Sequence, residues 1–493
     1  MGDAVVPGME QLRWHDSNIL SAISLGSIPW NGQTMHNSRS ETRRLPSNWS
    51  RRKRIGYISC CNPSSCSKTT QRARAPCMQL VEQHVISRSD PRFAAIDAAA
   101  FQSKNLYNAA LYEIWQAFIH HGTYLNYSEM DKRMQSHEAY RALPTKVSQQ
   151  VLRLLDKNWT SFFEALEAYK EDSSKFTGRP RLPKYKHKTE GRNILVYTLQ
   201  ALRGGQSKKG IRGRIRPSGL PIEVKTRQKD INQVRIVPRH GYYVVEVVYS
   251  KEPVQAQVDP SFCIAIDLGV TNLAAITSNR EGFVPRLVNG RMLKARNQWY
   301  NKRMKELQLC LPKAERERVT KQMQRITNKR NRQVDHYLHA ASKAIIDLMV
   351  KEGAGTLIIG KNPLWKQEVE NGRRNNQNFV NIPHARLIDM LTYKAALVGI
   401  QVEVQEESYT SKASFLDLDP IPTYHPNDET EYTFSGKRIG RRNRLYRAKG
   451  GRKICADVNG SYNILRKRKP DAFSKAKGVA AYVVQPLRLA ITV

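Results

Sequence analysis

Three short stretches place acidic residues at the ends of apolar segments or in tight turns. They are Ile264–Gly269, Gln405–Ser411 and Ala456–Gly460. Carboxylates in such places are the hard oxygen ligands that Mg²⁺ prefers. The same chain carries 81 Lys and Arg against 43 Asp and Glu, a formal charge of +38. This combination is typical of a protein that holds metal ions against a polyanion such as nucleic acid.

The acidic residues in these stretches have structural as well as chemical interpretations. Asp267 closes an apolar strand just before Gly269, so its carboxylate would stand at a strand end with space for a phosphate, or serve as an ordinary turn residue. Asp457 precedes a helical pattern, where it could equally be an N-cap. Glu406 and Glu407 follow a short strand, and strand alternation points them to opposite faces. Only one of these two glutamates is therefore expected to reach a metal ion.

The composition bounds the class of protein. With 493 residues, the chain is long enough for about two or three domains. The basic excess predicts a nucleic-acid partner, and no apolar run reaches the roughly 20 residues of a membrane-spanning helix, so we expect no membrane contact. The 7 cysteines do not suggest a disulfide framework, and we expect a reducing compartment. Cys61, Cys66 and Cys77 could in principle hold zinc, but no fourth ligand stands at a typical spacing.

Residues 1–77 differ in composition from the rest of the chain. They are rich in Ser, Arg, Asn and Pro and lack a helical or strand period, which predicts a basic disordered extension. The cluster Arg51–Arg54 is typical of a nuclear-localisation signal, whereas an acid-poor leader also suits an organelle transit peptide or a plain solvated tail. We expect a nuclear protein if the source is a eukaryote, with an organelle or the cytoplasm as alternatives.

Beyond residue 77, helical patterns come first and an alternating strand pattern follows. Apolar residues recur at helical spacing over residues 93–119 and 147–169. Ile236–Val237 and Tyr242–Tyr249 flank a turn and predict a β-hairpin. From about residue 261 strands alternate with helices, which predicts an α/β sheet. The expected strands are Cys263–Asp267, Leu273–Ile276, Thr356–Ile359 and Val402–Val404, and the expected helices cover Leu293–Met349 and begin again at Pro383.

Three ordered motifs resemble those of a known family. Ala265–Asn272, Tyr409–Lys412 and Cys455–Ile464 are similar to the RuvC-type nuclease motifs of TnpB proteins and of their eukaryotic relatives, the Fanzor proteins. The resemblance begins at Met78–Val81, includes Ser103–Asn108 and runs to about Lys467. One such motif alone would be weak, whereas the three in order are specific.

The resemblance implies an α+β multidomain fold, in which an RNase H-like (RuvC) α/β nuclease domain accompanies a helical recognition domain and a small β-barrel wedge domain. The implied boundaries are 78–172 for the start of the wedge domain and the recognition domain, 173–258 for the β-rich wedge domain, 259–468 for the nuclease domain and 469–493 for a C-terminal tail. Within the nuclease domain we expect a basic helical insertion at 292–352 and a basic loop at 412–454.

The resemblance also implies the catalytic residues. Asp267 and Asp457 match the first and third catalytic acids, and with a middle glutamate they would bind two Mg²⁺ ions, which Mn²⁺ could replace. Relatives commonly carry that glutamate at the end of the strand that precedes Lys361, where this chain has no acid. In some relatives it lies just before the Thr-Ser-Lys stretch. Glu407 best matches that place, with Glu406 as the fallback.

A second departure follows Ser411. Relatives often have a zinc ribbon of paired cysteines there, but Ala413–Ile454 contains no cysteine, so we expect no zinc. The segment keeps Phe434, Tyr446 and many basic residues, which suits single-stranded nucleic acid, and a solvated flexible loop is the alternative.

Other side chains are candidates for contacts with nucleic acid. They are Lys104, Asn105, Tyr107, Arg325, Lys329, Arg330, Arg332, Lys361, Trp365, Lys366, Arg441 and Arg442. Basic helical faces are often simply solvated, and Trp365 is more typical of a core or lid residue.

Charge and resemblance together predict an RNA-guided DNA endonuclease. It would bind a transposon-derived noncoding guide RNA and double-stranded target DNA, read a short flanking motif and act as a monomeric ribonucleoprotein. Two alternatives stay open. One is a guided DNA-binding protein that no longer cuts, and the other is an unguided structure-selective nuclease or transposition accessory protein.

Overall fold

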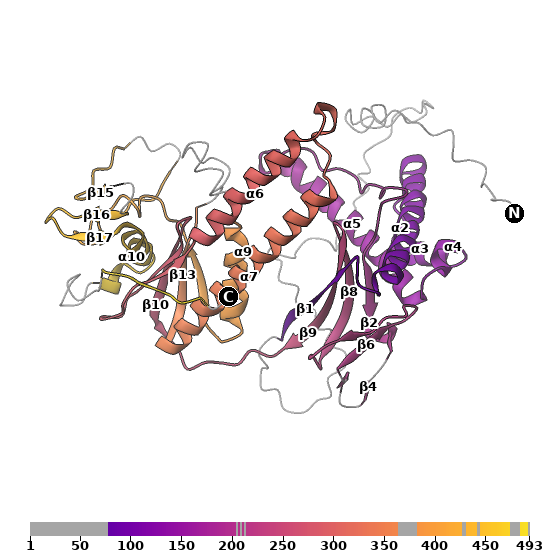
Figure 1. The fold of residues 1–493 in the computed structure, drawn as a ribbon, viewed down its shortest axis with the longest axis horizontal. Coiled ribbons are helices and arrows are strands. Elements are labelled where there is room, and N and C mark those ends of the chain that lie inside the picture. The colour runs from indigo at the N-terminus through magenta and orange to yellow at the C-terminus, as the bar shows by residue number, and fades with distance from the viewer. Residues whose placement is uncertain are drawn as a thin grey trace, which may run out of the picture. The chain divides into compact units, whose positions relative to one another are not determined.

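The computed structural model describes residues 77–203, 206–207, 210–211, 213–362, 382–425, 430–440, 444–473 and 484–491. All of them belong to one compact unit, Ala73–Val493 (Figure 1). The predicted extension, with its basic cluster Arg51–Arg54 and most of the clustered cysteines, lies outside the described residues. Among the described helices, none is both long enough and apolar enough to cross a bilayer.

The first half of the described chain combines one antiparallel sheet with helices. The sheet has the order β1 (Met78–Ser87), β9 (Tyr242–Lys251), β8 (Ile231–Arg239) and β2 (Leu195–Thr198). The helices are α2 (Phe93–His121), α3 (Tyr127–Met134), α4 (Glu138–Arg141) and α5 (Thr145–Glu171). The helices predicted near residues 93–119 and 147–169 and the β8–β9 hairpin are confirmed.

Helices and sheet share one hydrophobic core in this half. Ile96 of α2, Trp159 of α5 and Val245 of β9 belong to the same buried cluster. The expected barrel is not observed, because β1 and β2 stand at opposite edges of the sheet, and the described strands do not close it. The remaining strands form two small sheets. They are β3 (Leu202–Arg203), β6 (Arg214–Pro217) and β7 (Val224–Lys225) in one, and β4 (Gln206–Ser207) and β5 (Gly210–Ile211) in the other.

The second half is built on a six-stranded mixed sheet. Its strand order is β14 (Gln401–Gln405), β13 (Ala354–Gly360), β10 (Asp259–Leu268), β11 (Asn272–Ser278), β12 (Arg286–Asn289) and β18 (Leu487–Arg488). Strand β10 is antiparallel to β11 and parallel to β13, which is itself parallel to β14. The α/β sheet predicted from the alternating pattern is confirmed.

Helices cover both faces of this sheet (Figure 1). They are α6 (Arg291–Leu309), α7 (Lys321–Glu352), α9 (His384–Ala396) and α10 (Ala456–Arg468). Successive side chains of a strand point to opposite faces. Ile264 and Ile266 of β10 pack in the cluster that holds residues of α7 and α9, whereas Ala265 packs in the cluster of α10. Asp267, two residues after Ala265, therefore lies on the face that α10 covers.

A small antiparallel sheet replaces part of the loop expected at 412–454. Its strands are β15 (Lys437–Ile439), β16 (Leu445–Arg447) and β17 (Lys453–Cys455). Tyr446 is only 1% exposed and its hydroxyl donates to the carbonyl of Lys412 at 2.7 Å. Phe415 stacks on Tyr462 of α10 with ring centres 4.2 Å apart. Tyr446 is thus a core residue, and the expectation that it could stack on nucleic acid was wrong.

Candidate active site

Three neighbouring parallel strands, β10, β13 and β14, have their carboxyl ends side by side at one end of the six-stranded sheet. Facing pairs at that end are Ile266 with Ile359 and Gly360 with Gln405. Asp267 of β10 is therefore level with Gly360 of β13, and Glu407 follows two residues after the end of β14. The crevice beyond the carboxyl ends of parallel strands is the usual ligand site of open α/β sheets.

Asp267 is held where α10 comes closest to β10. The hydroxyl of Ser461 in α10 donates to the carbonyl of Ala265 at 3.0 Å. A Cβ atom at Gly460 would lie 2.7 Å from Oδ2 of Asp267. Real Cβ atoms do not approach other atoms so closely, so the missing side chain at residue 460 leaves the space that the Asp267 carboxylate occupies.

Glu407 is fixed through its backbone, while its carboxylate has an unpartnered oxygen. Its N–H donates to Oδ1 of Asn362 at 2.9 Å, and its carbonyl accepts from Oγ1 of Thr410 at 2.7 Å. Oε2 of Glu407 is buried and has no hydrogen-bond partner among the described residues. Leaving a buried carboxylate oxygen unpartnered is costly, so the position favours a cation ligand.

Glu406, the fallback choice, is engaged elsewhere. Its Oε2 pairs with Nζ of Lys467, whose side chain is 7% exposed, and its Oε1 accepts from the backbone N–H of Ser408 at 2.6 Å. Burial raises the pKa of Glu406, but the hydrogen bonds from Lys467 and Ser408 outweigh burial and bring that pKa below its usual range. Glu406 is therefore a structural ion-pair partner, and Glu407 is the glutamate that approaches Asp267.

Asp457 lies in the first turn of α10 and is 9% exposed. It is not the N-cap, which is Cys455. Arg444 donates to it twice, from Nε to Oδ2 at 3.0 Å and from Nη2 to Oδ1 at 2.5 Å. Nδ2 of Asn272 donates to Oδ2 at 2.6 Å, and Nη2 of Arg438 lies 3.9 Å from Oδ1. Both oxygens of Asp457 are thus paired.

The acids act on one another electrostatically. Burial raises the pKa of Asp267 well above its ordinary value, and the charges of Glu407 and Asp457 raise it further. Burial, with a contribution from Glu406, raises the pKa of Glu407 to about 7. Strongly raised carboxyl pKa values are concentrated at functional sites, and a divalent cation would relieve this repulsion.

The donor set suits a hard divalent cation in its chemistry, because it offers carboxylate oxygens, one of them buried and unpartnered. In the described parts of the chain, however, no group of three or more His, Cys, Asp or Glu side chains is placed so that it could hold a metal ion. The ion pair with Arg444 occupies both Asp457 oxygens. Arg444 has to release Asp457 before that carboxylate can bind an ion.

Two family models match the segments that carry these acids. Residues 246–365, with Asp267, match OrfB_IS605, described as a probable transposase. Residues 384–464, with Glu407 and Asp457, match the Cas12f1-like TNB domain. These segments form a TnpB-type RuvC domain. The TnpB part of the resemblance is confirmed, whereas the relation to Fanzor proteins stays a prediction. No curated protein matches the chain.

Several solved structures resemble the chain at low sequence identity. One is Cas12f1 in complex with sgRNA and target DNA, at 13% identity and a TM-score of 0.44 over 75% of this chain and 82% of that one. Another is the mini-RNA-guided endonuclease CRISPR-Cas_phi3, at 9% identity and a TM-score of 0.38, over 81% of this chain and 93% of that one. A third is Alicyclobacillus acidoterrestris C2c1 with single-guide RNA, at 9% identity and a TM-score of 0.34, over 76% of this chain and 67% of that one. The TM-scores are low, so these structures add no detail to the candidate site.

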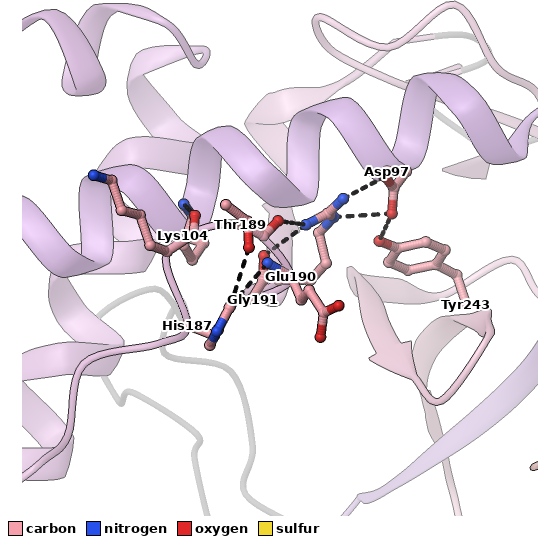
Figure 2. Close-up of polar contacts among 9 residues, drawn as sticks. Asp97, Lys104, His187, Thr189, Glu190, Gly191 and Tyr243 are labelled. Carbon is pink, nitrogen blue, oxygen red and sulfur yellow. Dashed lines mark hydrogen bonds and ion pairs between the residues drawn. The ribbon is translucent and has the colours of Figure 1, made fainter. Parts of the chain in front are cut away.

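Lys104, predicted to contact duplex DNA, lies inside the first half of the described chain. It is 3% exposed, and its Nζ donates to the carbonyl of Lys188 at 2.6 Å and lies 3.7 Å from the centre of the Phe101 ring. Burial and the nearby Arg192 lower its pKa. Figure 2 shows Lys104 near the segment from His187 to Gly191. Its ammonium group therefore stabilises the fold and does not face a phosphate in this conformation.

Beside Lys104, a polar cluster joins helix to sheet. Asp97 of α2 accepts from the Tyr243 hydroxyl of β9 at 2.7 Å and from Arg192 at 2.9 and 2.7 Å (Figure 2). Tyr107 is also buried, at 4% exposure, whereas Asn105 is exposed. Of the predicted motif at 104–107, only Asn105 is thus on the surface.

The basic face of α7 divides into exposed and partly buried residues. Arg325, Lys329 and Arg332 are exposed, as a phosphate contact requires, and their role stays a prediction. Arg330 is half-buried and donates from Nε to Oδ1 of Asn297 at 2.8 Å, and its guanidinium carbon lies 5.4 Å from the centre of the Tyr300 ring. Arg330 therefore helps to pack α7 against α6.

Lys361 follows β13 directly and is exposed. Its N–H donates to the carbonyl of Gln405 at 2.8 Å. Lys361 therefore lies at the carboxyl ends of the strands, as the acids do. The predicted nucleic-acid contacts of Trp365, Lys366, Arg441 and Arg442 lie outside the described residues.

A cavity of about 370 Å³ lies beside Arg438, a neighbour of Asp457. It is lined by Ser411, Lys412, Phe434, Gly436, Lys437, Arg438 and Tyr446. Tyr409 and Tyr432 meet edge to face nearby, with ring centres 5.2 Å apart. Arg438 connects this cavity to the site, because it also lies 3.9 Å from Asp457.

Sequence reasoning did not single out four residues that shape the TnpB-type site. They are Gly360, Gly460, Arg444 and Lys467. Gly460 carried a readable signal, because glycine inside a helix costs about 1 kcal/mol relative to alanine and needs a local reason. Arg444 was part of a basic run with no mark that would distinguish it from its neighbours.

Proposed function

We propose that the chain is an RNA-guided DNA endonuclease that cuts phosphodiester bonds with a RuvC-type site. The observation that carries the proposal is the convergence of acids from three separate motifs. Asp457 follows Asp267 by 190 residues, yet the charges of Glu407 and Asp457 both act on the carboxyl group of Asp267. A fold gains nothing in stability from such repulsion, so a ligand of opposite charge is its simplest explanation.

Asp267, Glu407 and Asp457 would hold Mg²⁺, which when bound in a pair supplies water activation and charge neutralisation at the scissile phosphate. The chain's own residues prepare that site. Gly360 and Gly460 leave space for the carboxylates, and Asn362 fixes the backbone of Glu407. Lys412, Lys437 and Arg438 line the neighbouring cavity, where their positive charges would orient the phosphates of a DNA strand.

The proposed partners follow from charge and family. A net charge of +38 suits a chain that covers the phosphates of both a guide RNA and a DNA target. The similar Cas12f1 structure is a complex with sgRNA and target DNA, and we extend this pair of partners to the chain.

The test is cleavage by the purified ribonucleoprotein. The protein is copurified with its RNA, the RNA is sequenced, and a matching DNA duplex is supplied with Mg²⁺. Asp267→Asn should lower the cleavage rate at least roughly a hundredfold, because an amide cannot replace a metal-binding carboxylate. The matched control is Asp389→Asn, an exposed aspartate of α9 in the same half of the chain. Equal cutting by Asp267→Asn and the control would refute the proposed site.

A guided DNA-binding protein that does not cut is the second candidate. It is favoured by the full pairing of Asp457 with Arg444 and Asn272 and by the lack, among described residues, of an acid group placed for a metal ion. It predicts RNA-dependent binding of the target without cleavage, in Mn²⁺ as well as in Mg²⁺. Cleavage that survives complete removal of RNA would instead indicate an unguided nuclease.

A further inference from the structure

A single turn joins the strand that carries Asp267 to a residue that contacts Asp457. Strand β10 ends at Leu268, and β11 begins at Asn272. Nδ2 of Asn272 donates to Oδ2 of Asp457 at 2.6 Å, across 185 residues of sequence. One hairpin therefore carries both the first acid and a hydrogen-bond donor to the third acid.

The backbone of this turn is held by contacts with two helices. His384 of α9 is buried, and its Nε2 donates to the carbonyl of Gly269 at 3.1 Å. The N–H of Gly290, the N-cap of α6, donates to the carbonyl of Thr271 at 2.9 Å. The side-chain amide of Asn272 thus extends from a fixed main chain, and its donor group has a defined place.

Asn272 and Arg444 donate to the same oxygen of Asp457 but differ in charge. A carboxylate offers about four acceptor positions. Arg444 fills one position on each oxygen, and Asn272 fills a second position on Oδ2. Release of Arg444 would free most of the carboxylate, while the amide would still hold its orientation. Unlike the guanidinium, the amide carries no net charge that repels a cation.

We propose that Asn272 is a positioning residue for Asp457, and that its hydrogen bond persists when Arg444 gives way to a metal ion. The inference rests on the proposed function, because the orientation of Asp457 matters only if this carboxylate binds an ion. Hydrogen bonds to metal ligands fix the direction of the ligand atoms, and their loss typically costs about 10- to 100-fold in metal affinity. Loss of Asn272 should therefore weaken metal binding, whereas loss of Arg444 from the same oxygen should strengthen it.

The test compares Mn²⁺ affinities, measured by isothermal titration calorimetry on the full chain. Asn272→Leu has nearly the same shape without a donor and should weaken Mn²⁺ binding about tenfold. Asn272→His should stay within about threefold of wild type, because Nδ1 of histidine can donate from the same distance along the side chain as Nδ2 of asparagine. The control is Asn232→Leu, which removes a half-buried amide of β8 that donates to Oγ of Ser250 at 2.7 Å, and it should leave the affinity unchanged.

A second readout separates positioning from a purely structural role. Asn272→Leu should need about tenfold more Mn²⁺ for half-maximal cleavage, while its affinity for target DNA stays that of wild type. An amide that only closes the turn between β10 and β11 would instead lower Tm in EDTA and leave both Mn²⁺ measurements unchanged. Asn272→Ala takes the place of Asn272→Leu if leucine prevents folding.

The outcomes distinguish the inference from the proposed function. If wild type binds Mn²⁺ and cuts DNA while Asn272→Leu binds the ion equally well, the inference is wrong and the proposed function stands. The same holds if Asn272→His binds Mn²⁺ no better than Asn272→Leu. If wild type neither binds Mn²⁺ nor cuts, the proposed function fails, and the inference fails with it.

Discussion

The guanidinium of Arg444 donates a hydrogen bond to each carboxylate oxygen of Asp457, from Nε to Oδ2 at 3.0 Å and from Nη2 to Oδ1 at 2.5 Å. Arg444 adopts a left-handed backbone conformation with φ of 48°, which is unfavourable for a residue other than glycine. Two-point pairing of this kind is among the stronger charge-assisted contacts in proteins. The same oxygens are those that the proposed metal site would need.

Removing Arg444 should therefore strengthen metal binding. Arg444→Ala frees the oxygens of Asp457 and removes a positive charge that repels a cation. We expect roughly tenfold tighter binding of Mn²⁺, which corresponds to about 1.4 kcal/mol, measured by isothermal titration calorimetry. The control is Arg447→Ala, an exposed arginine of the neighbouring strand β16 that carries the same charge. Equal Mn²⁺ affinities for Arg444→Ala and Arg447→Ala would show that Arg444 does not compete with the metal ion for Asp457.

Alanine at position 460 should disable the site and spare the fold. The added Cβ would come within 2.7 Å of Oδ2 of Asp267. This atom is the end of a side chain and not backbone, so a turn of the carboxylate can relieve the contact without a shift of the main chain. Alanine also favours the helix over glycine by about 1 kcal/mol. We expect Gly460→Ala to keep or raise Tm while cleavage falls at least roughly tenfold. Unchanged cleavage in Gly460→Ala would show that the position of Asp267 does not matter.

Burial of the Glu407 carboxyl group should make the metal-free protein less stable as the pH rises. Burial raises the pKa of Glu407 from 4.5 to about 7. A carboxyl with a raised pKa holds its proton more tightly when folded, so its destabilising effect is absent below the unfolded pKa and complete above the folded one. Glu407→Gln should thus raise the free energy of unfolding by about 3 kcal/mol well above pH 7, and by nothing near pH 4.5. Urea denaturation in EDTA at several pH values measures this gain, and Glu431→Gln, an exposed site, is the control.

Mutation should distinguish the structural role of Glu406 from the proposed metal-binding role of Glu407. Glu406→Gln breaks the pair with the buried Lys467 and should lower the free energy of unfolding by about 1–2 kcal/mol, while most of the cleavage activity remains. Glu407→Gln should abolish cleavage without any loss of stability. Steady-state cleavage and urea denaturation on both variants are the measurements. The reverse pattern would assign the metal ligand to Glu406.

The strands and long helices around the site were readable from sequence because each carries a clear local period. Apolar runs predicted β10 and β13, the alternating Val402 and Val404 predicted β14, and the position of Asp267 at a strand end followed from the first run. The choice between Glu406 and Glu407 was not readable in the same way, because it depends on Lys467, 61 residues further along the chain. Alternation shows that the two glutamates diverge but not which face holds the other acids.

Contacts between residues distant in sequence also explain why the predictions for Lys104 and Tyr446 were wrong. Lys104 was predicted to contact nucleic acid, but its ammonium group donates to the carbonyl of Lys188, 84 residues away. Strands β15 to β17 span only three residues each, too few to display a period. Tyr446 was therefore assigned to a loop, although it is part of the core.

The segment with the small β15–β17 sheet should be held together by hydrogen bonds, without a metal ion. Asp419, which is 5% exposed, accepts from the N–H of Ser414 at 2.8 Å, the N–H of Ser435 at 3.0 Å and the Ser435 hydroxyl at 2.5 Å. These bonds tie the stretch from Ser414 to Asp419 to Ser435, just before the sheet's first strand. Asp419→Ala should lower the free energy of unfolding by about 3 kcal/mol, because it leaves buried donors unpaired, whereas EDTA should leave amide hydrogen exchange in residues 430–455 unchanged. Glu431→Ala is the exposed control. Rapid exchange after EDTA treatment, with Asp419→Ala as stable as the control, would instead indicate a structural metal in this segment.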